Sequence, residues 1–343
     1  MSIVRNKSGR IAAALAFFLA SATAASAFTA CQVTDTGGID DNSFNQTAWK
    51  GVEDAKTQLG IEGRFLESQA ETDYEANINS LLGGGCDVII TVGFLLGDAT
   101  KKAAEANPEQ KFSIVDFAYD PVIPNVLGQV YATDEAAFLA GYLAAGMSKT
   151  GVLGVFGGIN IPPVTIFMDG FHAGAAYYNE KKGTSVSVLG WDPKAREGLF
   201  TNNFDSLDDG RAFAQNLYDE GADIVLPVAG PVGLGSATLA AELGTDKLKI
   251  IGVDADLYFT DPERKQVYLT SVTKRMDATV FDVIKAAMDG TFEGGILLGS
   301  LENGGVDLAP FHDMEDAIPA ELKQELDAIR AGIIDGSIKV GAE

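Results

Sequence analysis

Carboxylates stand at the ends of short apolar runs in this sequence. Asp116 follows "FSIV" and Asp254 follows "IIGV". An ionised carboxylate only accepts hydrogen bonds, and it can hold two neighbouring hydroxyls or two N–H groups. This chemistry suits the diol of a ribose or the N–H edge of a purine. A single aspartate at a strand end is as often a helix cap, so the hypothesis depends on several such ends showing the same residue types.

Aromatic and cationic side chains accompany these carboxylates. Phe44, together with Trp191 or Phe204, could supply apolar faces for a flat ring. Lys274 follows the run "LTSVT" and could balance the acidic groups or donate to a ring acceptor. The loop "GPVGLG" at 230–235 follows another apolar run, and glycines let backbone amides approach a ligand closely. The pattern predicts a binding site for a small planar solute.

Signatures of catalysis are weak. The two histidines, His172 and His312, have no metal-ligand spacing to another His or Cys, which argues against zinc. The chain contains no G-x-S-x-G elbow and no Walker A motif. A nucleoside hydrolase with calcium held by carboxylates is a remote alternative, because the usual spacing of a calcium loop is absent. We therefore expect binding without turnover, no metal and no cofactor.

The elements that must position these residues alternate between strand and helix. The apolar runs "CQVTD", "EGRFLES" and "DVIITVG" are each followed by a helical pattern, over about 45–59, 73–82 and 97–107. After the apolar helix "DEAAFLAGYLAAGMSK", the same plan restarts at "GVLGVFGG". Ligands of open parallel sheets bind beyond the carboxyl ends of the strands, so two facing sheets would bring all these ends to one cleft.

Two further predictions concern the ends of the chain. The stretch "GGILLGSLENGGVDLAPF" is typical of a β-hairpin that turns at 303–305. Residues 1–27 combine a basic start, an apolar core and a small-x-small site, which predicts a secretory signal peptide. The whole chain has a formal net charge of −23, and removal of the basic segment makes it more acidic. This charge argues against nucleic acid and anionic membrane surfaces as partners.

The only cysteines are Cys31 and Cys86. Each stands at the start of a predicted strand, and the two strands are neighbours in a doubly wound sheet, so we expect a disulfide. Two buried thiols are one alternative. Lipidation of Cys31 is another, although the preceding "FTA" fits a lipobox poorly.

Five stretches carry a resemblance to a known family. They are "GGIDDNSFNQTAWKGVEDA", "MDGFHAGAAYYN", "GADIVLPVAGPVGLG", "IIGVDAD" and "LTSVTKRMDATVFDVI". They resemble the basic membrane protein family of ABC-transporter substrate-binding proteins, whose best-understood members are purine nucleoside receptors. The similarity covers residues 31–311. It implies a two-lobed periplasmic-binding-protein fold of the ribose-binding type, with a parallel-rich sheet and helices on both faces in each lobe and three crossovers between lobes.

The resemblance also implies roles for individual residues. The family motif "DDxSFN" matches 40–45 and would place Asn45 and Phe44 against a base. Asp116 would take ribose hydroxyls, while Pro231 and Val232 depart from the small residues usual in the glycine-rich loop. The second stacking ring would be Phe204, Trp191 or Phe171. The predicted ligand-binding set is Asp41, Asn42, Phe44, Asn45, Phe94, Asp116, Phe171, Trp191, Phe204, Gly230, Gly233, Asp254 and Lys274.

The expected function is that of a monomeric periplasmic receptor. It would bind a nucleoside with a purine base in the cleft and deliver it to an ABC permease in the inner membrane. Riboflavin or a pentose is the alternative ligand within the same fold. The expected first lobe combines 28–147 with 256–292, and the second combines 148–255 with 293–343.

Overall fold

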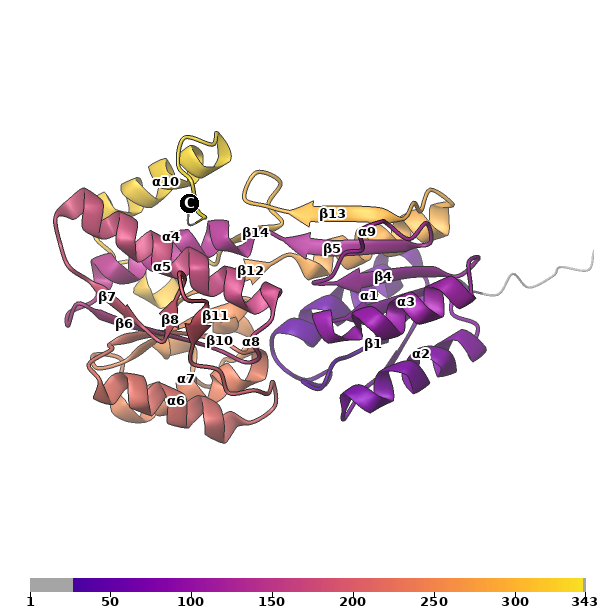
Figure 1. Cartoon of the computed structure of the whole chain (residues 1–343), viewed down its shortest axis with the longest axis horizontal. Coiled ribbons are helices and arrows are strands. Elements are labelled where there is room, and N and C mark those ends of the chain that lie inside the picture. The colour runs from indigo at the N-terminus through magenta and orange to yellow at the C-terminus, as the bar shows by residue number, and fades with distance from the viewer. Residues whose placement is uncertain (1–26, 342–343) are drawn as a thin grey trace, which may run out of the picture.

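The structure is a computed structural model that describes residues 27–341 (Figure 1). The predicted signal peptide therefore lies almost entirely outside the described residues. Within that range, no helix has both the length and the apolar character that a membrane crossing requires. The described chain forms two α/β lobes that lie side by side along the longest axis of the molecule.

The first lobe is built on a six-stranded sheet in which every neighbouring pair is parallel. In spatial order its strands are β13 (Gly295–Gly299), β5 (Val126–Tyr131), β4 (Lys111–Val115), β3 (Val88–Val92), β1 (Thr29–Val33) and β2 (Glu62–Leu66). Its helices are α1 (Phe44–Leu59), α2 (Tyr74–Gly83), α3 (Gly97–Ala106) and α9 (Met276–Asp289).

The second lobe repeats this plan. In spatial order its strands are β14 (Val306–Leu308), β12 (Tyr268–Lys274), β11 (Lys249–Asp254), β10 (Ile224–Val228), β6 (Val152–Gly157) and β7 (Ser187–Leu189). Only β14 runs antiparallel to its neighbour. Its helices are α4 (Thr133–Met147), α5 (Pro162–Lys182), α6 (Leu207–Asp219), α7 (Gly233–Leu243), α8 (Leu257–Thr260) and α10 (Ala320–Ile334). A small hairpin of β8 (Trp191–Asp192) and β9 (Glu197–Gly198) follows β7.

The order of the first five strands is the same in both sheets. It runs 2-1-3-4-5 in each, which is a doubly wound order with its switch point between the first and third strands. The predicted two-lobed fold and the repeated architecture are therefore confirmed. Strands such as β3, "VIITV", are buried along their whole length, because helices cover both faces of a parallel sheet.

The chain passes between the lobes three times, from β5 to α4, from β12 to α9, and from β13 to β14. The expected lobe boundaries were wrong at α4, β12 and β13. α4 packs on α5 and on β12 rather than in the first lobe, β12 pairs with β11, and β13 pairs with β5. On this basis we propose that the first lobe comprises residues 28–131 and 276–299, and that the second comprises the rest of the described chain.

The hairpin predicted at 303–305 was also wrong. β13 joins the first sheet and β14 joins the second, so the turn between them is a crossover. The sequence pattern was misleading because two short apolar strands around an Asn-Gly turn look the same whether they pair with each other or with separate sheets.

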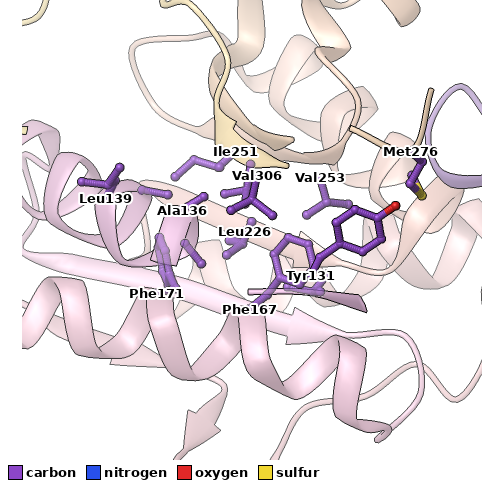
Figure 2. Close-up of a cluster of buried hydrophobic side chains, with 14 of the residues drawn as sticks. Tyr131, Ala136, Leu139, Phe167, Phe171, Leu226, Ile251, Val253, Met276 and Val306 are labelled. Atoms are coloured by element: carbon purple, nitrogen blue, oxygen red, sulfur yellow. The ribbon is translucent and has the colours of Figure 1, made fainter. Parts of the chain in front are cut away.

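A large apolar core extends through both lobes, and Figure 2 shows a part of it that lies beside the crossovers. Eleven of the 15 residues of α4 are buried, which explains why this helix has no polar stripe. Figure 2 shows Phe171 beside Ala136, with Leu139 on the same side, and Phe167 beside Tyr131.

Cys31 and Cys86 form a disulfide with a Cα–Cα distance of 6.0 Å, as predicted. It ties β1 to Cys86, which lies two residues before β3, the neighbour of β1 in the sheet. Both cysteines are buried. A sulfur that is bonded to Cys86 is not free to carry a lipid, so the structure argues against an anchor at Cys31.

Candidate functional site

Two adjoining cavities lie where the carboxyl ends of the strands of both lobes meet. The first has a volume of about 60 Å³ and the second of about 380 Å³. They share Phe94, Pro163 and Lys274 in their walls. Phe94 comes from the first lobe and Pro163 from the start of α5 in the second, so the two cavities are parts of one interlobe cleft.

A buried lysine links two carboxylates at the junction of the cavities. Lys274 Nζ lies 2.6 Å from Asp116 Oδ2 and 3.6 Å from Asp254 Oδ1. The side chain of Lys274 is 3% exposed, and those of the two aspartates are 8% exposed. Because Asp116 follows β4 and Lys274 ends β12, this ion pair connects the two lobes.

Burial and charge act against each other in this group. Burial raises the pKa of Asp116 and of Asp254, and the positive charge of Lys274 opposes both increases. Burial alone would lower the pKa of Lys274, but attraction by the two carboxylates raises it above its ordinary value. The lysine is therefore charged at neutral pH, and one cation faces two acids in a place with little water.

Both aspartates have left-handed backbone conformations. The φ angle is 65° at Asp116 and 68° at Asp254. For a non-glycine residue this conformation costs roughly 1–2 kcal/mol, and such strain gathers at functional sites. Asp254 ends the fourth strand of its 2-1-3-4-5 order, and Asp116 directly follows the fourth strand of the other. The repeated fold therefore places the same residue type in the same unusual geometry on both sides of the cleft.

Aromatic rings surround the lysine and line the two cavities. Lys274 Nζ lies 5.1 Å from the ring centroid of Phe44, 5.2 Å from that of Phe167 and 5.7 Å from that of Tyr131. Phe44 begins α1 in the first lobe, and Phe204 comes from the second lobe. The first cavity thus has an aromatic side chain from each lobe in its wall.

Asp41 and Asn45 also line the first cavity, but their polar atoms are engaged within the protein. Asp41 Oδ2 accepts from the backbone N–H of Asn45 at 2.7 Å, and Asp41 Oδ1 accepts from those of Ser43 at 3.0 Å and Gln46 at 3.1 Å. These contacts cap the N-terminus of α1. Asn45 Nδ2 donates to Asp41 Oδ2 at 3.0 Å and to Asp35 Oδ1 at 2.7 Å.

This network holds two buried acids under the cavity. Burial raises the pKa of Asp35 to about 6 and that of Asp41 to about 7, although hydrogen bonds from N–H donors oppose both shifts. Ser43, in the same loop, donates from Oγ to Asp254 Oδ2 at 3.1 Å and so adds a second polar contact between the lobes. The loop that carries the "DDNSFN" motif is therefore fixed to both lobes.

Most of the predicted site residues meet at the cleft. The residues that line one or both cavities are Asp41, Phe44, Asn45, Phe94, Asp116, Phe204, Gly230, Asp254 and Lys274. The residues that line neither are Asn42, Phe171, Trp191 and Gly233.

Each of these four residues has another structural place. Phe171 is fully buried in the core between α4 and α5 (Figure 2), and the indole N–H of Trp191 donates to Asp169 Oδ1 at 2.8 Å. Asn42 is a turn residue with a φ of 57°, and Gly233 is buried at the start of α7. Of the competing second rings, only Phe204 lies at the cavity.

Sequence reasoning missed Asp35, Phe167 and the start of α5. Asp35 stands at the end of the run "CQVTD", so the rule that selected Asp116 and Asp254 could have found it. Ile161, Pro163 and Phe167 bring an apolar wall from the second lobe. Nothing in the sequence separates Phe167 from a core residue of the same helix.

Among residues 27–341, no group of three or more His, Cys, Asp or Glu side chains is arranged to hold a metal ion. The site offers hydrogen-bond acceptors, one buried cation and aromatic faces. This combination can bind a small polar molecule that has a flat apolar part.

Comparisons with known proteins agree with this arrangement. A family model described as "ABC transporter substrate-binding protein PnrA-like" matches residues 28–343. Basic membrane protein A of Borreliella burgdorferi is 34% identical over 89% of this chain and 85% of its own length. The ABC transporter nucleoside-binding protein BmpA of Lactococcus lactis is 33% identical over 90% of this chain and 87% of its own length.

A solved structure is similar over nearly the whole chain. The crystal structure of an ABC transporter solute-binding protein from Aeropyrum pernix matches with a TM-score of 0.83 and 27% identity, over 91% of this chain and 92% of that one.

Proposed function

Because the chain belongs to the PnrA-like family of ABC transporter substrate-binding proteins, which are not enzymes, we propose that it is the receptor for a nucleoside with a purine base. The observation that carries this proposal is the cavity with Phe44 and Phe204 on opposite lobes, beside Lys274. A relative of similar length bears the name of a nucleoside-binding protein, which supports the same ligand class.

The base would lie between the rings of Phe44 and Phe204. Stacking on an aromatic side chain contributes about 1–3 kcal/mol per base. The two rings belong to different lobes, so a base between them would favour the closed arrangement. Since both rings tolerate any planar base, stacking alone would not distinguish purines from each other.

The polar groups would supply specificity. Asp116 would accept from the ribose diol, while Asp254 and Lys274 would meet the polar edge of the base. Hydrogen bonds to charged groups contribute roughly 1.5–3 kcal/mol each, and an analogue that leaves a buried partner unpaired is rejected strongly. A ligand that lacks a ribose would leave Asp116 without its partner hydroxyls.

Binding would shift the molecule toward the closed form. A ligand can do this only through contacts that it makes better in one conformation than in the other. The Lys274–Asp116 ion pair and the Ser43–Asp254 hydrogen bond already join the lobes at the site, so a ligand that adds contacts to both lobes there stabilises closure. The closed form, a monomer in the periplasm, would then deliver the ligand to a permease in the inner membrane.

A ligand panel tests the proposal directly. Purified protein is melted in the presence of adenosine, guanosine, inosine, free bases, ribose and riboflavin. A rise in melting temperature with purine nucleosides is expected, because a ligand that binds only the folded state stabilises it. A rise with ribose alone or riboflavin alone would reject the nucleoside assignment and support the corresponding alternative.

The two strand-end aspartates should have different effects on specificity. Asp116→Asn should weaken binding of all ribosides alike, because it alters the partner of the shared diol. Asp254→Asn should change the order of preference among purines, because it alters a contact to the base. Calorimetric titration of both variants with the same nucleosides checks this, and identical affinity profiles would contradict the assigned roles.

A further inference from the structure

The second cavity differs from the first in its volume and in the side chains of its wall. It is the larger of the two, at about 380 Å³ against about 60 Å³. Its wall includes the apolar side chains of Phe117 and Val130 from the first lobe and of Pro162 and Ile166 from the second. Of the described residues in that wall, only Asp116 and Lys274 are charged, and they are paired with each other at 2.6 Å.

The position of the second cavity determines which part of the proposed nucleoside would enter it. If the base lies between Phe44 and Phe204, and Asp116 holds the diol, the ribose occupies the boundary between the cavities. The carbon with the terminal hydroxymethyl group lies on the other side of the ring oxygen from the base. A substituent on that carbon therefore extends past Lys274 into the second cavity.

We propose that the second cavity receives a small apolar substituent on the terminal carbon of the ribose, so that the preferred ligand class is nucleosides with a thioether in place of the terminal hydroxyl. This inference rests on the nucleoside assignment. Burial of apolar surface against Phe117, Val130 and Ile166 would add affinity that a plain nucleoside does not gain. A phosphate at the same carbon is excluded, because Asp116 repels it and Lys274 is already engaged by two carboxylates.

Calorimetric titration with three probes tests the proposal. The probes are adenosine, adenosine monophosphate and methylthioadenosine, in which a methylthio group replaces the terminal hydroxyl. We expect methylthioadenosine to bind about tenfold more tightly than adenosine, from burial of the added apolar group, and the monophosphate to bind most weakly.

A pair of variants assigns the effect to the cavity. Ile166→Trp fills the second cavity and should abolish the preference for methylthioadenosine over adenosine. Ala176→Trp adds the same ring to an exposed position of the same helix, outside both cavities, and should preserve the preference. For each variant, the affinity for methylthioadenosine is divided by the affinity for adenosine. A general loss of stability affects both affinities and therefore does not change this ratio.

The outcomes separate the two proposals. If adenosine binds but methylthioadenosine binds no more tightly, or if Ile166→Trp leaves the ratio unchanged, the inference fails and the nucleoside assignment stands. If none of the three probes binds, the inference fails, and the nucleoside assignment fails with it if guanosine and inosine also leave the melting temperature unchanged.

Discussion

Phe44 and Phe204 reach the first cavity from opposite lobes, and Phe44 also lies over the charge of Lys274. Phe44→Ala should weaken nucleoside binding at least about fivefold, because stacking contributes about 1–3 kcal/mol per base. Calorimetric titration measures the loss. Phe259→Ala is a matched control, because Phe259 is 69% exposed and lines neither cavity. Wild-type affinity in the Phe44→Ala variant would show that Phe44 does not stack on the base.

Asp35 should make the stability of the protein depend on pH. Burial raises the pKa of its carboxyl to about 6, with smaller contributions from Asp254 and Asp116, so the folded state favours the protonated form. The contribution of this group to stability is therefore present at low pH. It falls by up to about 1.4 kcal/mol per pH unit between about pH 4 and pH 6, then stays constant.

Asp35→Asn should remove this part of the pH dependence. The amide oxygen can still accept from Gly37 N–H and from Asn45 Nδ2, which now bond to Asp35 Oδ1 at 2.9 Å and 2.7 Å. The ligand-free variant should match the wild type near pH 4 and be more stable by about 1–3 kcal/mol at pH 8. Thermal melts across this range provide the measurement, and a difference that does not vary with pH would contradict the prediction.

At the scale of single elements, α1 depends on the loop that precedes it. The carboxylate of Asp41 accepts from three backbone N–H groups near the start of this helix. Asp41→Ala should lower the free energy of unfolding by about 1–2 kcal/mol, the usual cost of a lost helix cap. Asp40→Ala is the control, because Asp40 is the neighbour of Asp41 in the sequence and has the same side chain, but it is exposed. Denaturant titration distinguishes the two, and equal stability would show that Asp41 is not a cap.

The boundaries of elements could be read from the sequence with little error. The helix predicted over 45–59 is observed as Phe44–Leu59, because its apolar spacing is regular and Gly60 ends it in a left-handed conformation. The sequence did not show which sheet β13 would join or on which sheet α4 would pack. An apolar pattern says that a segment is buried, but it does not say which of two similar sheets buries it.

The same limit applies to the candidate site. Asp116, Asp254 and Lys274 were predicted to lie together because the carboxyl ends of parallel strands meet at one edge, and the structure brings these three side chains together. Phe171 and Trp191 were selected wrongly, whereas Phe167 was missed, because a ring in a core and a ring at a cavity look alike in sequence. Only packing between α4 and α5 decides which ring of α5 faces the cleft.

For the whole molecule, the disulfide restricts the unfolded chain. The bond joins residues 55 positions apart and lies away from the carboxyl ends that form the cleft. Replacing Cys31 and Cys86 with alanine should lower the free energy of unfolding by about 2–4 kcal/mol and leave nucleoside affinity unchanged. Denaturant unfolding and calorimetric titration of the same preparation test both parts. A loss of affinity without a loss of stability would show that the bond shapes the site instead.

β13 and β14 come late in the chain, at Gly295–Gly299 and Val306–Leu308, yet each completes a different sheet. During synthesis, neither sheet is complete until these residues have been translated. Until then, β5 and β12 are unpaired along the edges that later bind β13 and β14. Such edges attract other strands, and a product cut short before Gly295 would be prone to aggregate. Premature termination should therefore yield two defective halves rather than one intact lobe and one damaged lobe.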